Sequence, residues 1–432
     1  QKNYFDYGLW PGEIKFYNKQ TGFKYEDILS IAEDKGGNLW LGTSGKGLIR
    51  FTENSYQIFN EKNGLVSDAI RALYFDKEGS LWVGNSGGGL FKTKNRAAVT
   101  YQQKDGLSDN SFWSLAQDHF GNIWAGSSNG GINVITKNGI RKISINEGLP
   151  EGRVRTIFCD KKNQIWIGTS KGGVVVFGKD KKFFINSKNG LGSDDVRVIF
   201  EDSKGRVWIG TRHNCKCYIN GKLYRHDEIL GKSPAPQRYI TEDMNGNLYF
   251  GNANSGLVVF EGNKITQYTK NEGLISNDIL SIYCDKEGMV WVGTGEGLAR
   301  LYKNKITNIP YDPLIHLHEV LNIQEDNYGN LWMSSFVGII SIHKKYINDF
   351  IDGKISSIPY RVYGKLDGMA STECNGANQN AGLKSRDGRM WFPTMNGIVV
   401  VDPYEIEKTR NKTIPDVAID FIAVNDSLVN FL

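Results

Sequence analysis

The stretch EDKGGNLWLGTSGKGLIRF at residues 33–51 is repeated along the chain. Most later copies keep a turn with Asp and Gly, an aromatic residue between apolar neighbours and a second glycine-rich turn, as in CDKEGMVWVGTGEGLARL at 284–301. The first eight aromatic anchors are 41 or 42 residues apart, which identifies an array of one structural unit. The nine anchors are Trp40, Trp82, Trp124, Trp166, Trp208, Tyr249, Trp291, Trp332 and Trp391.

Each unit has the pattern of four short strands separated by tight turns. In the first unit, the alternating stretch ILSIAED precedes the Asp/Gly turn, and LWLGTSG, GLIRF and SYQIFN follow it. Four antiparallel strands in about 40–45 residues form one blade of a β-propeller. We therefore predict an all-β propeller with nine four-stranded repeats. The anchor aromatics are expected to pack one blade against the next, and Gly42 and its equivalents to let the second strand approach its neighbours closely.

The closure of the ring is open to two arrangements. Residues 13–23, EIKFYNKQTGF, match the fourth strand of a unit, whereas the last unit ends at a third strand, GIVVVDP at 397–403. The favoured prediction is a single nine-bladed ring over residues 1–403, in which the N-terminal strand completes the last blade. The alternative is a seven-bladed ring plus two blades of a neighbouring propeller. Residues 404–432 are predicted to be a linker and the first strand of a truncated immunoglobulin-like domain.

Composition and charge exclude several classes of function. The 432 residues carry 52 Lys+Arg and 47 Asp+Glu, a net charge of +5 that is spread too evenly for a nucleic-acid or anionic-membrane surface. No apolar run approaches the ~20 residues that span a bilayer, and no leader precedes Gln1, which predicts a cytoplasmic chain or a processed exported one. The 5 Cys are an odd number without framework spacing, so no disulfide scaffold is predicted. No catalytic or metal-binding motif is present, and we expect no cofactor, no metal and no enzyme activity.

The repeat also points to a family. The pattern D-x-x-G-x-[LIV]-W-[LIV]-G-T-x-x-G, preceded by N-G-L-x-S-D, resembles the two-component-regulator propeller repeat. Residues 364–408 and IPDVAIDFIAVN at 414–425 are similar to the last blade of such sensors and the start of their Y-Y-Y sandwich domain. The resemblance implies the periplasmic part of a hybrid two-component sensor, many of which detect oligosaccharides. Such sensors have about fourteen repeats in two rings, against nine here, and their membrane, kinase and response-regulator parts are not in this sequence.

Candidate binding residues emerge when the first strands are aligned on the turn Asp. Three residues before it the positions are apolar and expected in the core, as at Ile31 and Ile157. Five residues before it, near the face that carries the loops, five consecutive units have a cationic or aromatic residue, and Arg153 lies two residues nearer that face. Arginine forks bind carboxylate or sulfate, and an indole stacks on a sugar ring. The predicted ligand-binding residues are Arg71, Trp113, Arg153, Arg155, Arg197 and Arg238. The alternative is that each Arg pairs with a nearby acid, such as Asp194, Asp195 or Glu201.

Three further features add weaker candidates. The turn of the fifth unit is replaced by Arg212-His213-Asn214-Cys215-Lys216-Cys217, where His213 could contact a ligand or, with the two Cys, a soft metal. The insertion before the last unit contains Asn378 and Asn380, whose amides suit hydrogen bonds to sugar hydroxyls, although turn formation would also explain them. Phe336 and Met395 depart from the repeat and could line the same face.

These features favour an exported sensor propeller that binds a small molecule or an oligosaccharide, with the arginines favouring an acidic one. We expect it in the periplasm or at the cell surface, its signal peptide already removed, with no nucleic-acid partner and no membrane insertion of its own. Homodimerisation through C-terminal regions outside this sequence is a further expectation. The alternative function is a protein-interaction scaffold of the cell envelope, similar to a secretion-apparatus propeller. A propeller lyase or glycosidase is disfavoured, because paired carboxylates are missing from the inner strands.

Overall fold

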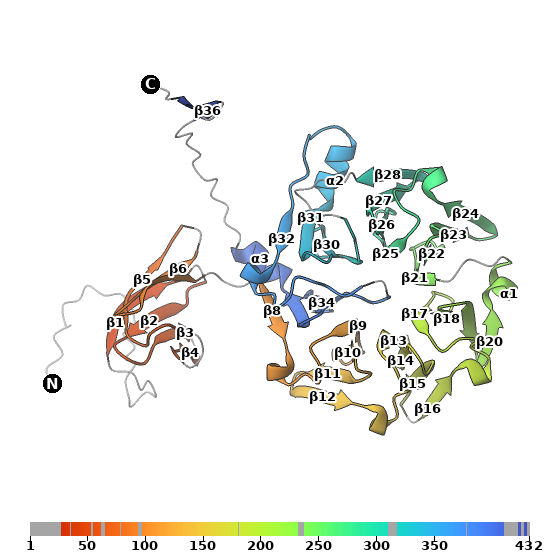
Figure 1. Ribbon diagram of the computed structural model, residues 1–432, viewed down its shortest axis with the longest axis horizontal. Helices are drawn as coiled ribbons and strands as arrows, with labels where there is room; N and C mark the ends of the chain where they lie inside the picture. The colour runs from red at the N-terminus through yellow and green to blue at the C-terminus, as the bar shows by residue number, and fades with distance from the viewer. Residues whose placement is uncertain are drawn as a thin grey trace, which may run out of the picture. The chain divides into compact units, whose positions relative to one another are not determined.

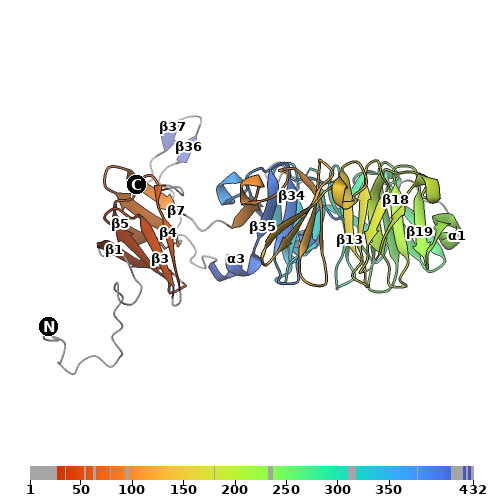
Figure 2. The ribbon, with the colours of Figure 1, turned by 90° about the horizontal axis from the view of Figure 1, so that it is seen from below.

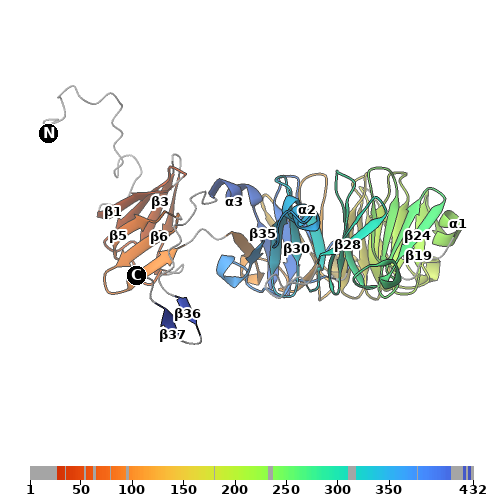
Figure 3. The ribbon, with the colours of Figure 1, turned by 90° about the horizontal axis from the view of Figure 1, so that it is seen from above.

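The computed structural model describes residues 27–34, 36–52, 55–61, 65–77, 79–93, 97–179, 181–231, 237–309, 318–376, 378–409, 422–424 and 427–429. The chain divides into two compact units, one formed by residues 96–406 and the other by residues 1–95 and 407–432. Within 96–406, the described strands form seven four-stranded antiparallel sheets arranged as a ring (Figure 1). Figures 2 and 3 show this ring edge-on, with the strands running between its two faces. The predicted all-β propeller is confirmed.

The strands of the ring follow the repeat of the sequence. The first, innermost strands are β9 (Phe112–Gln117), β13 (Val154–Cys159), β17 (Val196–Glu201), β21 (Gln237–Glu242), β25 (Ile279–Cys284), β29 (Asn322–Glu325) and β33 (Leu383–Lys384). The second strands are β10 (Ile123–Ser127), β14 (Ile165–Thr169), β18 (Val207–Thr211), β22 (Leu248–Asn252), β26 (Val290–Thr294), β30 (Asn330–Ser334) and β34 (Met390–Thr394). The third strands are β11 (Ile132–Thr136), β15 (Val174–Phe177), β19 (Cys215–Ile219), β23 (Leu257–Glu261), β27 (Gly297–Tyr302), β31 (Ile339–His343) and β35 (Gly397–Val401). The fourth strands are β12 (Gly139–Ile143), β16 (Lys182–Ile185), β20 (Lys222–Arg225), β24 (Lys264–Tyr268), β28 (Lys305–Ile309), β32 (Arg361–Tyr363) and β8 (Ala98–Tyr101).

The ring closes through β8, the fourth strand of the last blade. This strand precedes β9 in sequence but pairs with β35, with Ala98 opposite Val401 and Tyr101 opposite Ile398. The innermost strands then contact one another in order from β9 to β33, and β33 contacts β9. The favoured nine-bladed ring is therefore wrong, and the seven-bladed alternative describes residues 98–401. Residues 13–23 lie outside the described residues, but the place assigned to them beside β35 is taken by β8.

The remaining two repeats form the second unit. One sheet contains β1 (Ile28–Glu33), β2 (Leu39–Thr43), β3 (Leu48–Thr52) and β4 (Ser55–Phe59), and the other contains β5 (Ile70–Phe75), β6 (Leu81–Asn85) and β7 (Gly89–Thr93). Ile31, which the repeat assigns to the core, is 62% exposed, whereas its equivalent Ile157 in the ring is fully buried. The prediction of a core position fails at Ile31 because no described residue covers that face of β1.

The anchor aromatics pack between blades and also bind the turns. Trp166 is 2% exposed and meets Tyr218 of the next blade edge-on, with the ring centroids 5.3 Å apart. Its indole N–H donates to Oδ2 of Asp160 at 2.8 Å, while Oδ1 of Asp160 accepts from the backbone of Gln164. The predicted packing role is confirmed, and each turn Asp that bonds its anchor ties the turn to the blade core. The close approach expected at the glycines is seen at Gly168, where a Cβ would lie 2.6 Å from the side chain of Val196.

Short helices lie in the segments that connect the strands. The α-helices are α1 (His226–Leu230), α2 (Lys344–Ile351) and α3 (Pro403–Thr409), and the 3-10 helices are η3 (Gln103–Asp105), η4 (Ile145–Glu147), η5 (Ser187–Asn189), η6 (Lys270–Glu272) and η7 (Lys365–Asp367). In the C-terminal part, β36 (Ile422–Val424) pairs with β37 (Ser427–Val429). Among the described residues, no helix has the length and apolar character needed to cross a bilayer.

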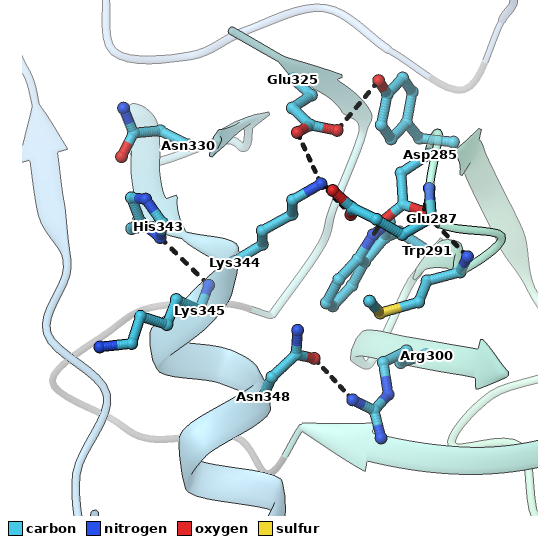
Figure 4. A network of polar contacts seen from close by, with 12 residues as sticks. Asp285, Glu287, Trp291, Arg300, Glu325, Asn330, His343, Lys344, Lys345 and Asn348 are labelled. Carbon is cyan, nitrogen blue, oxygen red and sulfur yellow. Dashed lines mark hydrogen bonds and ion pairs between the residues drawn. The ribbon is translucent and has the colours of Figure 1, made fainter. Parts of the chain in front are cut away.

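Helix α2 lies between the third and fourth strands of its blade, in place of the usual short turn. Its first residue, Lys344, places a largely buried ammonium group against the neighbouring blade (Figure 4). The Lys344 ammonium lies 2.8 Å from Glu325, contacts Glu287 and lies 3.8 Å from the fully buried Asp285. Burial lowers the pKa of Lys344. The hydrogen bonds that Lys344 donates to Glu287 and Glu325 outweigh this effect, so the net pKa is raised. The network therefore fastens the blade of β25 to that of β29.

Candidate functional site

A backbone irregularity puts the predicted site residues at the centre of the ring. In each blade from β9 to β25 the pairing of the first and second strands shifts by one residue, as between Val154 and Thr156. The residue skipped by the shift is a bulge, and it is not held in the regular alternation of the strand. The bulge residues are Trp113, Arg155, Arg197, Arg238 and Leu280.

The bulge side chains contact the next blade in a regular way. Arg238 donates to Asp278 at 2.8 Å, and Asp278 lies two residues before the bulge of the following blade. In the same register, Nε of Arg155 lies 3.0 Å from Asp195. Trp113 contacts Arg153, whose guanidinium carbon lies 5.8 Å from the indole centroid. Each of these three bulge residues therefore faces the residue two positions before the next bulge.

Asp195 is shared by two arginines. Its Oδ2 lies 3.6 Å from Nη2 of Arg197, in addition to the contact of Oδ1 with Arg155. Among the described residues, three buried atoms of this group have no hydrogen-bond partner: Nε of Arg155, Nε of Arg197 and Oδ1 of Asp195. The contacts with Asp195 are therefore ion pairs in which the N–H groups are poorly aligned for hydrogen bonding. The predicted pairing with an acid is thus seen at Asp195. Asp194 and Glu201 instead accept from the backbone of Ser187 and Lys161.

A fourth guanidinium belongs to the same group. The backbone N–H of Arg212 donates to the carbonyl of Asp195 at 2.9 Å, which joins the turn after β18 to the loop before β17. Burial lowers the pKa of Arg155, Asp195 opposes this, and the charges of Arg197, Arg153 and Arg212 lower it further. We call Arg153, Arg155, Arg197 and Arg212 the arginine cluster. Among the described residues, all ion pairs of these four arginines are with Asp195.

Two of the predicted arginines lie apart from the cluster. Arg71 is on β5, in the unit of residues 1–95 and 407–432, so the five consecutive positions of the sequence become four in the ring. Arg238 is on β21 and has its own carboxylate partner in Asp278. Arg212 was not among the site residues predicted from the sequence. It belongs to the stretch that replaces the usual glycine-rich turn, and this departure from the repeat was the signal that could have included it.

The insertion before the last blade fills the centre of the ring. We call the described residues 373–376 and 378–382 the plug; in Figure 1 this segment reaches from the last blade into the middle of the ring. Gln379 accepts from the backbone N–H of Ile240 at 2.9 Å and donates to its carbonyl at 2.7 Å. The backbone N–H of Gln379 donates to the carbonyl of Arg197, and Asn375 donates to that of Phe112. The plug thereby satisfies backbone groups at the free edges of innermost strands.

The predicted asparagines belong to this plug. Asn380 donates to the carbonyl of Ile157 at 2.8 Å, and its own carbonyl accepts from Leu115. Asn378 is 1% exposed and donates to the carbonyl of Gly376. Both amides thus donate to backbone carbonyls inside the protein, and their role in ligand binding stays a prediction.

The candidate metal ligands of the fifth unit are not brought together. Cys215 and Cys217 are 1% and 0% exposed, and burial raises the pKa of both thiols. His213 is exposed in the turn above them. Over the described ranges, no group of three His, Cys, Asp or Glu side chains has metal-binding geometry.

Apolar side chains lie on the same face beside the plug. Phe336, Val337 and Met395 are 47%, 47% and 44% exposed, in the turns between the second and third strands of two adjacent blades. The backbone N–H of Cys374 donates to Ser335, and that of Met395 to Glu373, so the plug holds both turns. We call Phe336, Val337 and Met395 the apolar patch.

Comparison with known proteins identifies the repeat. Six segments match the family described as two component regulator propeller. They are residues 22–45, 64–87, 106–129, 148–171, 190–213 and 273–296. A search of curated proteins returns no match.

Solved structures with the same fold include extracellular domains of putative two component systems. The extracellular domain of the putative hybrid two component system BT3049 from B. thetaiotaomicron has a TM-score of 0.70 and 23% identity, over 93% of this chain and 56% of that one. The corresponding domain of BT4673 from the same organism has a TM-score of 0.58 and 20% identity, with the same coverage. PorZ of the type-IX secretion system of Porphyromonas gingivalis has a TM-score of 0.51 and 13% identity, over 87% of this chain and 68% of that one. The chain thus spans little more than half the length of the two ectodomains.

Proposed function

Because the chain carries two component regulator propeller repeats, we propose that it is the ligand-binding propeller of a two-component-type sensor and that it recognises an acidic oligosaccharide through the arginine cluster. The site comprises this cluster and the neighbouring Trp113. The likeness to ectodomains described as extracellular supports a periplasmic or cell-surface location.

The observation that carries the proposal is the charge imbalance of the cluster. Among the described residues, the carboxylate that forms ion pairs with this group of four guanidiniums is that of Asp195, and it pairs with Arg155 and Arg197. The Arg153 guanidinium lies over the indole of Trp113. Strand bulges position Trp113, Arg155 and Arg197, so little ordering of these three residues is required when a ligand binds. Guanidiniums pair with carboxylate or sulfate groups, and an indole offers an apolar surface to a sugar ring.

The chemistry proposed for this site is binding and not catalysis. The proposed site consists of the guanidiniums of the arginine cluster and the indole of Trp113. Neither kind of group exchanges protons near neutral pH. General acid or base catalysis would need His or a carboxyl group placed to exchange a proton with the substrate. The carboxyl group in the cluster, that of Asp195, is already paired with Arg155 and Arg197.

The test is a thermal-shift screen against neutral, uronate-containing and sulfated oligosaccharides. A ligand at 100 times its dissociation constant adds about 2.7 kcal/mol to the free energy of unfolding, which is readily measured. We expect shifts with acidic sugars only, and their loss in Arg155→Ala/Arg197→Ala. The matched control is Arg141→Ala/Lys142→Ala, which removes two exposed cations from β12 and should keep the shifts. An equal response to neutral sugars would contradict the proposal.

A protein-interaction scaffold is the second candidate, and the apolar patch favours it. Exposed Phe336, Val337 and Met395 together are typical of a protein contact. If no sugar of the panel stabilises the chain, and a protein partner is retained by the wild type but lost in Phe336→Ser/Met395→Ser, the scaffold is the function.

A further inference from the structure

We infer that, within the proposed site, Arg197 is the guanidinium that binds the anionic group of the ligand, a carboxylate or a sulfate, and that the equivalent Arg238 of the next blade is not. This inference rests on the proposed function. It separates two residues that the repeat makes equivalent.

The contacts between neighbouring blades distinguish the two arginines. A bulge residue faces the residue two positions before the next bulge, as Arg155 faces Asp195 and Arg238 faces Asp278. Where this position is acidic, the arginine has an internal partner for its charge. Nη1 of Arg238 donates to such a partner at 2.8 Å, so the charge of Arg238 is paired without a ligand.

By sequence, the position that corresponds to Asp195 and Asp278 is not acidic for Arg197. The residue two positions before Arg238 is Pro236, which has no charged group and lies outside the described residues. The ion pair recorded for Arg197 is a 3.6 Å contact with Asp195, a carboxylate that already lies 3.0 Å from Arg155. Arg197 consequently has guanidinium N–H groups available for an external oxyanion.

The position of Arg197 also suits binding. Its side chain is 22% exposed, so it is accessible although the surroundings are largely buried. Its backbone carbonyl accepts from Gln379 of the plug, which fixes this part of β17. Arg212 from the same blade and Arg155 from the preceding one add positive charge, which favours an oxyanion next to Arg197.

Asp195 then limits the affinity of the site. It repels an incoming oxyanion and pairs with the arginines that would bind it. Neutralising this carboxylate should release Arg155 and strengthen binding, whereas in a site without an anionic ligand the same change brings no gain in binding.

The experiment measures binding of three probes by calorimetry: tri-galacturonate, a sulfated galactose disaccharide and maltotriose. The variants are Arg197→Ala, the matched Arg238→Ala, and Asp195→Asn. For the acidic probe that binds, we expect Arg197→Ala to weaken binding about 10- to 100-fold, as for a lost charge-assisted pair. Arg238→Ala should change the affinity less than about threefold, and Asp195→Asn should tighten binding about threefold. The uronate and sulfate arms identify which oxyanion is bound.

Any one of three results would overturn the inference. Equal losses in Arg197→Ala and Arg238→Ala, or weaker binding in Asp195→Asn, would remove the special role of Arg197 and leave the proposed function standing. Absence of binding by both acidic probes, to the wild type and to Asp195→Asn, would remove both. Thermal unfolding of each variant without ligand identifies a variant that fails to fold. If Arg197→Ala does not fold, Arg197→Lys replaces it. This variant keeps the charge but loses the planar fork of donors, so we expect a partial loss of affinity.

Discussion

In every blade of the ring except the last, where Ser385 takes the place of Asp, one carboxylate at the turn between the first and second strands organises the backbone and the blade core together. Oδ1 of Asp118 accepts from the backbone of Phe120 and Asn122, and Oδ2 accepts from the indole of Trp124 and the amide of Asn122. Sequence analysis identified these aspartates as turn residues, which is confirmed. The bond to the tryptophan six residues later was not predicted, because a spacing in sequence does not specify where a side chain points.

These bonds make stability depend on acid pH. Burial raises the pKa of Asp118, but the bonds from Trp124 and Asn122 outweigh it, and the net pKa is lowered from 3.8. A carboxyl group with a lowered pKa stabilises the fold above its unfolded pKa, and the contribution is lost as the pH falls through the folded pKa. We therefore expect Asp118→Asn to lower the melting temperature at pH 6, with the difference shrinking as the pH falls below the unfolded pKa of about 4. The measurement is calorimetric melting of both proteins from pH 6 to pH 2.5. A difference that is constant with pH would contradict this account.

Among the larger elements, the plug carries a second prediction. Gln379 is 4% exposed and makes two hydrogen bonds to the backbone of Ile240. Gln379→Ala leaves a buried donor and a buried acceptor unsatisfied, which should cost about 2 kcal/mol of the free energy of unfolding. The control is Gln103→Ala, which removes an exposed glutamine that also donates to a backbone carbonyl. Urea unfolding of both variants tests it, and equal midpoints would show that the plug contributes no stability.

The charged network of α2 gives a third prediction. The side chain of Lys344 is 12% exposed and faces the carboxylates of Glu325, Glu287 and Asp285 (Figure 4). Lys344→Met leaves these carboxylates without their cation, so we expect a loss of about 3 kcal/mol at pH 7. Because the pKa of Lys344 is raised, its contribution is complete below the unfolded pKa of about 10.4 and is lost as the pH rises through the folded pKa, so the loss should be smaller at about pH 11 than at pH 7. Lys345→Met, which removes a cation that is 70% exposed, is the control. Urea unfolding at both pH values is the measurement, and a similar loss in the control would argue against the network.

The candidate site was predictable in part. The alignment of first strands identified Trp113, Arg155 and Arg197 because the repeat fixes which residue each blade presents at the bulge. It also selected Arg71, because the repeat is the same whichever unit a blade joins. The plug was not predictable as a plug. Its hydrogen bonds join residues far apart in sequence, as Asn380 joins Ile157, and depend on the ring having formed.

For the whole molecule, the number of blades was the main feature that the sequence did not determine. The blade itself was predicted because its strands and turns are local. Residues 98–101 read as the fourth strand of the second repeat, and residues 13–23 have a similar pattern. Any fourth strand has the composition to pair with β35, so closure depends on ring geometry and not on a local signal. The structure selects β8.

Closure by β8 is testable with one substitution. Ala98 is fully buried beside Val399 and Val401, while Val99 on the same strand is 58% exposed. Ala98→Asp places a charge in this contact, and we expect it to detach β8 and lower the free energy of unfolding by about 3 kcal/mol or more. Val99→Asp should be close to neutral. Thermal melting and size-exclusion chromatography provide the comparison, and equal behaviour of the two variants would contradict closure through this strand.

The pairing of β8 with β35 has a mechanical consequence. The chain enters the ring at Ala98 and leaves it after Val401, and these two residues are opposite each other at the same end of the antiparallel pair. Tension applied between the preceding and following segments would load the backbone hydrogen bonds one after another, from Ala98 towards Tyr101, and not all at once. An unzipping geometry yields at a lower force than a shearing one. Pulling on the chain would therefore open the propeller at this joint while the other six blades remain intact.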